Sequence, residues 1–296
     1  LHVSELIDMN DNKVLERPLP TTIDLDVHGD NRGWFKENWQ REKLTELASE
    51  LASFQPVQNN ISYNHAGATR GLHAEPWDKL ISVAHGKIFG AWCDLREGSE
   101  SFGEVVTHEV GPETAVFVPR GVANGFQALE ETSYCYLVNE HWSAEARYSA
   151  VNLNIVDWPL APTEISEKDK QHPALKDVSP MPARRILVTG ANGQLGRALK
   201  RLLADAEFCT HADFDITNPP ERNWKQYSTI INCAAYNDVN GAESDRAAAW
   251  AVNAEGPAKL ARIAAENQIT LVHVSSDYIF DGANEVHTEE ELPSPL

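Results

Sequence analysis

The feature that most constrains the fold is a change of pattern near residues 173–185. Before it, strand-length apolar runs alternate with glycine-containing turns, at 80–84, 88–95, 104–110, 115–119 and 134–139. After it, the pattern becomes strand, helix, strand, with strands expected at 185–189, 229–233 and 270–275. Many short strands indicate a sandwich or barrel, whereas strands that alternate with helices indicate a parallel sheet covered by helices. The chain therefore predicts two domains of different fold class.

Helices are expected in both parts of the chain. Apolar residues at helical spacing predict one amphipathic helix over residues 41–54: Leu44, Leu47, Ala48 and Leu51. In the second part, helices are expected at 194–204 and through most of 246–267. A polar stretch that contains three prolines separates the two patterns and reads as a linker: Pro173, Pro180 and Pro182. The predicted domains are residues 1–178 and 185–296, joined by a linker at 179–184.

Composition excludes several classes of function. The formal net charge of −19 argues against non-specific nucleic-acid binding, which needs basic patches. No apolar run approaches the roughly 20 residues that span a bilayer, and the first residues lack a secretion pattern. The four cysteines form no C-x-x-C pair, so neither a zinc site nor a disulfide framework is expected. We therefore expect a cytoplasmic protein that binds neither membrane nor nucleic acid.

A glycine triplet opens the second domain. Gly190-x-x-Gly193-x-x-Gly196 directly follows the strand expected at 185–189 and begins a helix. Glycines in this context let the backbone turn tightly and approach a pyrophosphate, whose charge is stabilised at the helix amino terminus. Asp213 and Asp215 follow roughly 20 residues later, where an acidic group can contact the adenosine half of a dinucleotide. The pattern predicts a Rossmann-like dinucleotide site.

Three further motifs resemble the dTDP-4-dehydrorhamnose reductases, which are extended short-chain dehydrogenases: Asn232-Cys-Ala-Ala-Tyr236, Val252-Asn-Ala and Ser275-Ser-Asp-Tyr-Ile-Phe-Asp-Gly282. The resemblance implies NADPH or NADH as cofactor, bound by Gly190, Asn192, Gly193, Gln194, Leu195, Gly196, Asp215, Ile216, Ala234, Ala235, Tyr236 and Asn253. It also implies that Ser276 hydrogen-bonds the carbonyl that receives hydride and that Tyr278 contacts the sugar. The family's Tyr-x-x-x-Lys pair follows Pro-x-Pro-Leu, and this sequence ends at Pro293-Ser-Pro-Leu296. We therefore expect this domain to be incomplete and unable by itself to reduce a ketone.

Six dispersed motifs in the first domain resemble dTDP-4-dehydrorhamnose 3,5-epimerase, a cupin with a jelly-roll fold. They occur in the family's order and span most of residues 20–175: Asp30-x-Arg32-Gly33, Gln58-Asn-Asn60, Arg70-Gly-Leu-His73, Asp94-Leu-Arg96, Pro119-Arg-Gly and Ser166-Glu-Lys-Asp169. The fold class expected for the whole chain is an all-β jelly roll followed by an incomplete α/β Rossmann-like parallel sheet.

The chemistry of epimerisation fits the residue types in these motifs. Inverting a carbon beside a ketone needs a base for the α-proton, charge stabilisation for the enolate and an acid on the opposite face. By the family pattern His73 is the base, Asp169 its partner, Lys79 the enolate stabiliser and Tyr136 the acid. Tyr134 points to the same face as Tyr136, and periodicity alone cannot choose between them. The resemblance also implies these substrate-binding residues: Arg32 and Arg70 on the diphosphate, with Glu37, Gln58, Asn60 and Asn124 around the sugar nucleotide.

Two departures from the family pattern leave the substrate open. Asn124 stands where the family often has an imidazole, and His141-Trp142 replaces a Tyr-Tyr pair. The best hypothesis is a bifunctional enzyme of dTDP-L-rhamnose synthesis that epimerises dTDP-4-dehydro-6-deoxy-D-glucose and, in the complete chain, reduces the product with NADPH or NADH. One alternative is an epimerase for another nucleotide deoxysugar, acting at one carbon. The other is a non-catalytic cupin that binds nucleotide sugars.

Two expectations concern assembly and metals. A homodimer is expected through the first domain, from the family resemblance and because its strand edges need protection. Metal-binding cupins need clustered His and carboxylate ligands, such as His-x-His with a nearby Glu. No such cluster is visible in the sequence, so no metal site is predicted.

Overall fold

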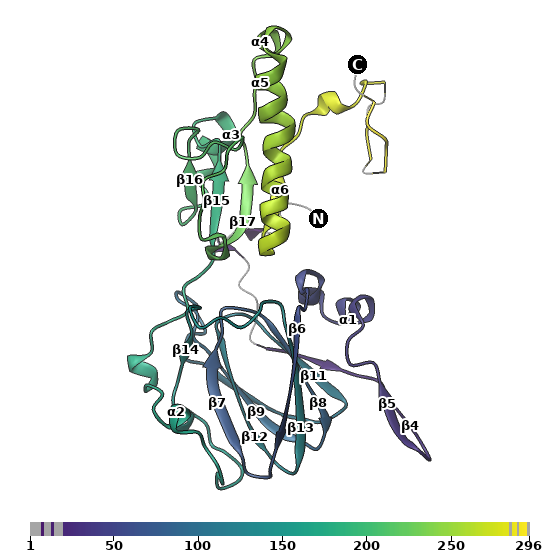
Figure 1. The fold of residues 1–296 in the computed structure, drawn as a ribbon, viewed down its shortest axis with the longest axis vertical. Helices are drawn as coiled ribbons and strands as arrows, with labels where there is room; N and C mark the ends of the chain where they lie inside the picture. Colours follow the sequence, from purple (N-terminus) through teal and green to yellow (C-terminus); the bar gives the residue numbers. More distant parts are fainter. Residues whose placement is uncertain (1–6, 9–12, 15–19, 284–285, 289, 295–296) are drawn as a thin grey trace. The chain divides into compact units, whose positions relative to one another are not determined.

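The computed structural model describes residues 7–8, 13–14, 20–283, 286–288 and 290–294 (Figure 1). The last two residues of the predicted Pro293-Ser-Pro-Leu296 motif lie outside the described residues. The chain divides into two compact units, Leu1–Ala183 and Arg184–Leu296, and each is described by itself. No helix among the described residues is long and apolar enough to cross a membrane.

Two five-stranded sheets, with every pairing antiparallel, form the first unit. One has the order β10-β9-β12-β7-β14, from Val105–Val110, Ile88–Asp94, Val122–Ala128, Thr69–Ala74 and Ser149–Ala150. The other has the order β3-β11-β8-β13-β6, from Thr21–Asp24, Thr114–Val118, Lys79–His85, Thr132–Val138 and Gln58–Asn64. Two small pairs complete the unit: β1 (Ile7–Asp8) with β2 (Lys13–Val14), and β4 (Val27–Asp30) with β5 (Gly33–Lys36). The predicted all-β sandwich is confirmed.

Alternating side chains on the strands build the core between the two sheets. On β11, Val116 and Val118 face this core, whereas Ala115 and Phe117 face the opposite side of the sheet. Trp92, 1% exposed on β9, lies in the same core. Each large apolar side chain buried in this way contributes roughly 1.5–3 kcal/mol before its entropy cost is counted. The sandwich is thus a rigid platform on which polar residues can be held.

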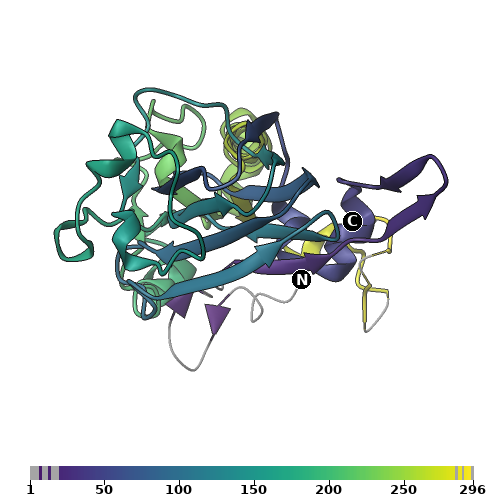
Figure 2. The ribbon, with the colours of Figure 1, turned by 90° about the horizontal axis from the view of Figure 1, so that it is seen from below.

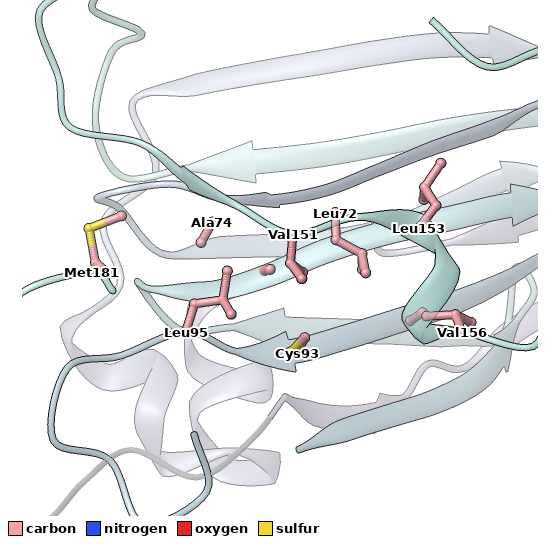
Figure 3. Packing of buried hydrophobic residues seen from close by; sticks show 10 residues of the cluster. Leu72, Ala74, Cys93, Leu95, Val151, Leu153, Val156 and Met181 are labelled. Carbon is pink, nitrogen blue, oxygen red and sulfur yellow. The ribbon is translucent and has the colours of Figure 1, made fainter. Parts of the chain in front are cut away.

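The segment from Ser149 to Met181 covers the outer face of the β7-β9-β12 sheet. Its residues Val151, Leu153 and Met181 pack against Leu72 of β7 and Cys93 of β9 (Figure 3). The same segment carries the short helix α2 (Glu167–Lys170), whose amino terminus is capped by the side chain of Ser166. Docking of this segment therefore fixes the position of α2 against β7.

The predicted single helix over residues 41–54 is wrong. The structure has α1 (Arg41–Leu47) followed by a 3₁₀ helix at Ser49–Ser53, with Ala48 in an extended conformation between them. The break lets Leu44, Ala48 and Leu51 all reach the core beneath the second sheet, whereas Leu47 is 65% exposed. A continuous helix would have kept Leu47 on the buried face.

The second unit is a four-stranded parallel sheet with the order β16-β15-β17-β18, from Glu207–Cys209, Arg185–Thr189, Tyr227–Asn232 and Thr270–His273. Its helices are α3, α4, α5 and α6, at Gln194–Leu199, Val239–Ser244, Arg246–Trp250 and Gly256–Asn267. A π-helical turn joins α5 to α6, so the helix expected over most of 246–267 is confirmed. The helix α3 is shorter than predicted, because residues beyond Leu199 continue as turns. The predicted parallel sheet is confirmed, and it is consistent with an incomplete Rossmann-like domain.

Candidate functional site

A cavity of about 650 Å³ lies in the first unit. Strands β6, β7, β8, β12 and β13 line it together with the segment around α2. Seven of the site residues predicted from the sequence line this cavity: Asn60, Arg70, His73, Lys79, Asn124, Tyr136 and Asp169. Residues that are far apart in the sequence thus meet where the sandwich is open, and the cavity is large enough for a small organic ligand.

His73 and Asp169 form a hydrogen-bonded pair at this cavity. The distance from His73 Nε2 to Asp169 Oδ1 is 2.9 Å, and the amide of Gly71 donates to the other carboxylate oxygen at 3.2 Å. Burial alone raises the pKa of Asp169, but the bonds from His73, Gly71 and Ser166 outweigh it and lower the pKa to about 2. Asp169 is therefore an anion that accepts the Nε2 proton, which leaves the lone pair of a neutral His73 on Nδ1.

Lys79 lies beside an acidic residue that the sequence motifs did not single out. Its Nζ is 2.6 Å from Oε1 of Glu75, and their side chains are only 8% and 16% exposed. The same ammonium lies 5.1 Å from the ring centroid of Tyr136. Burial, and then the charge of Glu75, raise the pKa of Tyr136, so its hydroxyl keeps its proton at neutral pH. A proton donor and a cation are thus neighbours in one cavity.

Tyr134 and Tyr136 differ in burial although both line the cavity. Tyr134 is 3% exposed, stacks on Phe126 with ring centroids 4.3 Å apart, and accepts a hydrogen bond from Asn124 Nδ2 at 3.2 Å. Burial strongly raises the pKa of Tyr134. Tyr136 is only partly buried. Tyr134 and Asn124 therefore form a fixed wall, and Tyr136 has the better access to a ligand.

Three predicted substrate residues of the first unit lie outside the cavity lining. Arg32 is on the β4–β5 hairpin, where its side chain is 90% exposed and pairs with Asp30. The hairpin projects from the sandwich (Figure 2). Glu37 is exposed and pairs with Lys43. Gln58 reaches the site indirectly, because its Nε2 donates to Asn60 Oδ1 at 2.9 Å. Within one chain, then, the structure does not bring Arg32 and Glu37 to the other predicted residues.

A second imidazole accompanies the His73–Asp169 pair. His172 follows α2, its side chain is 7% exposed, and its Nε2 lies 3.8 Å from Asp169 Oδ1. Its ring packs edge-on against the ring of His73, with centroids 5.0 Å apart. Burial, and then the charge of His73, lower the pKa of His172. No cluster of His and carboxylate groups is visible in the sequence, but the fold brings these three together from positions 73, 169 and 172.

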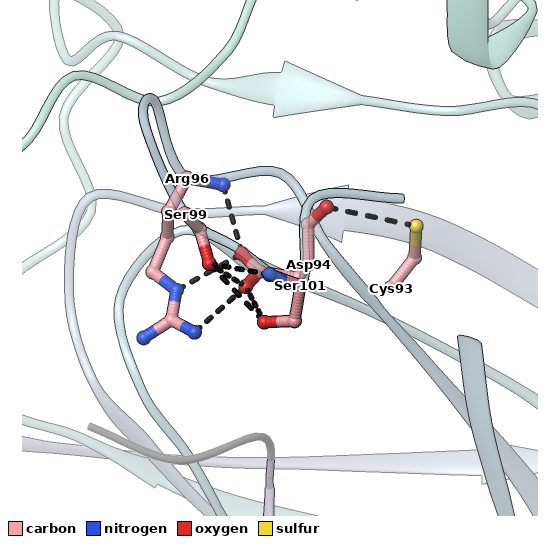
Figure 4. A network of polar contacts seen from close by, with 5 residues as sticks. All are labelled: Cys93, Asp94, Arg96, Ser99 and Ser101. Atoms are coloured by element: carbon pink, nitrogen blue, oxygen red, sulfur yellow. Dashed lines mark hydrogen bonds and ion pairs between the residues drawn. The ribbon is translucent and has the colours of Figure 1, made fainter. Parts of the chain in front are cut away.

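The Asp94-Leu-Arg96 motif is a structural network rather than part of the cavity lining. Asp94 is fully buried at the end of β9 and accepts hydrogen bonds from Arg96 at 2.7 Å and from Ser99 and Ser101 at 2.6 Å each (Figure 4). Burial alone raises its pKa, but these bonds lower the pKa to about 2. The network ties the turn after β9 to the sheet.

In the second unit, the three glycines of the loop have different roles. Gly190 has φ +68°, and a Cβ there would lie 2.6 Å from the backbone nitrogen of Ala234. A Cβ on Gly196 would lie 2.5 Å from the carbonyl oxygen of Gly190. Gly193 has an ordinary extended conformation, and a Cβ would meet only the Gly190 oxygen at 3.2 Å. Packing within the chain requires glycine at 190 and 196, whereas at the exposed position 193 a Cβ would make one tight contact, with a backbone oxygen of the loop itself.

The other predicted cofactor residues of the second unit differ in their hydrogen bonds and in their exposure. Asp215 accepts hydrogen bonds from the amide and hydroxyl of Thr217 at 2.8 Å, and those bonds lower its pKa. Asn253 and the backbone of Tyr236 exchange two hydrogen bonds. Side chains exposed to solvent are those of Asn192, Gln194, Leu195 and Ala235, and Ala234 is partly buried.

Three further predicted residues of the second unit, Ile216, Ser276 and Asp213, have the following burial and hydrogen bonds. Ile216 is buried in the core, so its side chain serves packing and only its backbone could face a ligand. Ser276 is exposed and accepts a hydrogen bond from the amide of Tyr278, which is itself 78% exposed. Asp213 binds the amide and hydroxyl of Thr210, so it is oriented by its own turn.

Residues 19–177 match the protein family described as dTDP-4-dehydrorhamnose 3,5-epimerase, and residues 184–296 match the family described as RmlD substrate binding domain. Over 180 residues the chain is 49% identical to the protein RmlC homolog of Streptococcus pyogenes, covering 57% of this chain and 91% of that protein. The solved structure of RmlC from Streptococcus suis in complex with dTDP-D-xylose is 47% identical, with a TM-score of 0.52, and the match covers 56% of this chain and 93% of that one.

The second unit has a shorter match. Over 106 residues the chain is 48% identical to the dTDP-4-dehydrorhamnose reductase of Mycobacterium tuberculosis, covering 34% of this chain and 35% of the reductase. The chain therefore spans about a third of the length of that relative. The likeness concerns the part of a reductase that contains the glycine loop.

Proposed function

Since the chain belongs to the dTDP-4-dehydrorhamnose 3,5-epimerase family, we propose that its cavity epimerises dTDP-4-dehydro-6-deoxy-D-glucose at C3 and C5. The observation that carries this proposal is the pairing of His73 with Asp169 at a cavity that also holds Lys79 and Tyr136. These side chains supply a base, an anion that orients it, a cation and a phenolic acid. Together they are the groups that inversion beside a ketone requires.

In the first step, Nδ1 of His73 takes the α-proton of the sugar. Asp169 holds Nε2–H at 2.9 Å and stabilises the imidazolium that forms. The electrons of the broken C–H bond move to the ketone oxygen, which becomes an enolate. Lys79, whose ammonium lies 5.1 Å from the Tyr136 ring centroid, stabilises the negative charge on that oxygen.

In the second step, Tyr136 returns a proton to the carbon from the opposite face. Its raised pKa keeps the hydroxyl protonated until the enolate forms. Glu75 holds the Lys79 ammonium and so acts as a positioning residue. We assign the role of proton donor to Tyr136 rather than Tyr134, because Tyr134 is 3% exposed and its hydroxyl accepts a hydrogen bond from Asn124. The same sequence of steps at the second carbon completes the inversion at C3 and C5.

Deuterium uptake from heavy water into C3 and C5 tests the epimerase. We expect His73→Ala to lower uptake by about 10²–10⁴, because the general base is lost. The exposed His65 supplies a matched control, and His65→Ala keeps the wild-type rate. Uptake at the wild-type rate in His73→Ala would refute the assignment. Uptake at one carbon only would favour an epimerase that acts at a single position, and binding without uptake would favour a non-catalytic cupin.

We further propose a homodimer in which Arg32 of one copy serves the cavity of the other. Arg32 is exposed, lies outside the cavity lining of its own chain, and shares its hairpin with the exposed Trp34 and Phe35. Strand β6 is also an edge strand beside the cavity and exposes Ile61 and Tyr63. Substrate diphosphate would then lie between Arg32 of one copy and Arg70 of the other.

Mixing two inactive variants tests this arrangement. A mixed dimer of Arg32→Ala and His73→Ala chains contains one cavity with both residues intact if Arg32 acts between copies. Mixing should then restore up to about a quarter of wild-type activity by random assortment into dimers. Light scattering measures the oligomeric state independently. A monomeric mass, or no recovery on mixing, would contradict the proposal.

For the second unit, we propose that the glycine loop binds the pyrophosphate of NADPH or NADH. The exposed Gly193 supports this, because a Cβ there would crowd the Gly190 carbonyl oxygen at 3.2 Å on the surface of the loop that a pyrophosphate would approach. In a chain with the complete reductase part, bound nicotinamide would supply a hydride for the C4 ketone, and Ser276 would hydrogen-bond that carbonyl. Calorimetric titration of the full chain with each dinucleotide tests binding, and heat that is unchanged in Gly193→Val would contradict it.

Together these proposals describe a bifunctional enzyme of dTDP-L-rhamnose synthesis in the cytoplasm. Its domains are residues 1–178 and 185–296 with a linker at 179–184, in keeping with compact units that meet between Ala183 and Arg184. The product of the epimerase is the ketone that the reductase family acts on. Fusion would keep the second reaction close to the source of its substrate.

A further inference from the structure

His172 provides a buried imidazole that the epimerase mechanism does not use. Its side chain is more than nine-tenths buried, and its Nδ1 has no hydrogen-bond partner among the described residues. Its Nε2 lies 3.8 Å from Asp169 Oδ1, which is beyond hydrogen-bond range. His172 Nε2 therefore remains available as a ligand atom on the side of the ring that faces Asp169.

The three groups have the spacing of a metal site. One ligand atom from each of His73, Asp169 and His172 lies within 4.8 Å of the other two. Nitrogen and oxygen ligands bind Zn²⁺ at about 2.0–2.2 Å, so tetrahedral geometry places ligand atoms about 3.3 Å apart. The separations to Asp169 Oδ1, 2.9 Å from His73 and 3.8 Å from His172, lie on either side of that value. Shifts of a few tenths of an ångström would equalise them.

The surroundings leave room for a fourth ligand. The His73 side chain is 37% exposed and lines the cavity, so water or a substrate oxygen can reach the fourth position. Lys168 lines the same cavity and adds positive charge, which weakens the attraction for a cation. Three protein ligands with one open position resemble catalytic rather than structural sites, so we expect weaker binding than in a closed four-ligand site.

We propose that His73, Asp169 and His172 form a binding site for a divalent first-row transition metal of the Zn²⁺ class, and that its occupancy stops epimerisation. A metal on Nε2 of His73 displaces the proton that Asp169 accepts. A neutral ring must then carry that proton on Nδ1, so the total number of protons on the ring is unchanged but the basic lone pair is lost. The inhibition rests on the proposed role of His73 as the base, whereas metal binding does not.

Titration of the full chain with Zn²⁺ and Co²⁺, after treatment with a chelator, tests the proposal. In the wild type, Zn²⁺ should abolish deuterium uptake at near one equivalent per site, and EDTA should restore it. His172→Phe keeps a ring against His73 but has no ligand nitrogen, and it should need at least about tenfold more Zn²⁺. Inhibition is expressed relative to the metal-free rate of each variant. His65→Asn, on the exposed His65–Glu131 pair, should respond like the wild type.

Cobalt gives a readout that does not depend on activity. Co²⁺ should give the intense visible absorption of a four-coordinate ion in the wild type and in His65→Asn, but not in His172→Phe. Equal zinc sensitivity of the wild type and His172→Phe, or cobalt spectra that do not differ, would overturn the proposal. If His172→Phe does not fold, as judged by circular dichroism, His172→Gln replaces it. A wild type that takes up no deuterium but shows the cobalt bands would refute the epimerase function and keep the metal site.

Discussion

Replacing Asp94 by Asn should destabilise the first unit without touching its cavity. The carboxylate is fully buried and accepts hydrogen bonds from Arg96, Ser99 and Ser101. Its pKa lies at about 2 rather than 3.8, and at about 1.4 kcal/mol per pKa unit this difference contributes about 2 kcal/mol at neutral pH. The neutral amide would also remove the Asp94 negative charge from Arg96, whose side chain is 17% exposed. We therefore expect a loss of about 2–4 kcal/mol.

Hydrogen exchange read by mass spectrometry measures this loss separately in each unit. Peptides from β9 in Asp94→Asn should lose protection, whereas peptides from β15 in the second unit should not change. The chain offers a matched control, because Asp30-x-Arg32 repeats the Asp-x-Arg pattern on an exposed hairpin. Asp30→Asn should leave exchange in β9 unchanged, since exposed ion pairs contribute little.

The pH dependence has a definite sign. The pKa of Asp94 is lower in the folded chain, so its contribution is complete above the unfolded pKa of 3.8 and is lost as pH falls through about 2. The difference in stability between the wild type and Asp94→Asn should therefore be constant from pH 7 to about 5 and fall to about half near pH 3. A difference that stays constant down to pH 3, or that is absent at pH 7, would refute this reasoning.

Three further outcomes are expected. Tyr136→Phe should slow epimerisation by about 10²–10⁴ while proton exchange by the base persists, whereas Tyr134→Phe should keep most activity; equal losses in deuterium and product assays would contradict the assignment of the acid. Glu75→Gln should lower kcat by about tenfold, because Lys79 loses the carboxylate that positions it, and unchanged steady-state kinetics would exclude that role. Gly193→Ala should weaken NADPH binding by about tenfold in calorimetry with only a small loss of thermal stability from the 3.2 Å contact to the Gly190 oxygen, and a large loss of stability would instead assign this glycine to packing.

The sequence predicted strands well where apolar residues follow one another almost without interruption. Strands β8, β9 and β11 are nearly continuous apolar runs, and the expected ranges agree closely with the structure. Strands β6, β7 and β12 were not identified individually from the sequence. These strands line the cavity and carry Asn60, Arg70 and Asn124, so polar residues interrupt the apolar pattern. The polar residues that a strand contributes to the cavity thus make that strand harder to recognise from its sequence.

The candidate site was predicted from motifs rather than from geometry. His73 and Asp169 each stand in a motif of the family pattern, and the structure places them in contact. Glu75 and His172 stand outside those motifs, and each acquires its place only through folding. Glu75 meets Lys79 where the chain turns from β7 to β8, and His172 meets His73 because the 149–181 segment docks on the sheet. The motifs in the sequence therefore did not indicate the Glu75–Lys79 contact or the His172–His73 contact.

The docking of the 149–181 segment also implies an order of folding, in which the sheets form before the His73–Asp169 pair is complete. Asp169 follows His73 by 96 residues, and both five-stranded sheets except β14 are complete by Val138. During synthesis or refolding, the sandwich can form while the base still has no carboxylate, because long-range contacts form late. Val151 and Leu153 pack on the outer face of β7 in the same segment that carries Asp169, so we expect docking of this segment to bring the carboxylate to His73. Recovery of activity should therefore report completion of the first unit. The interval between sheet formation and recovery of activity then measures how long the 149–181 segment takes to dock and place Asp169 beside His73.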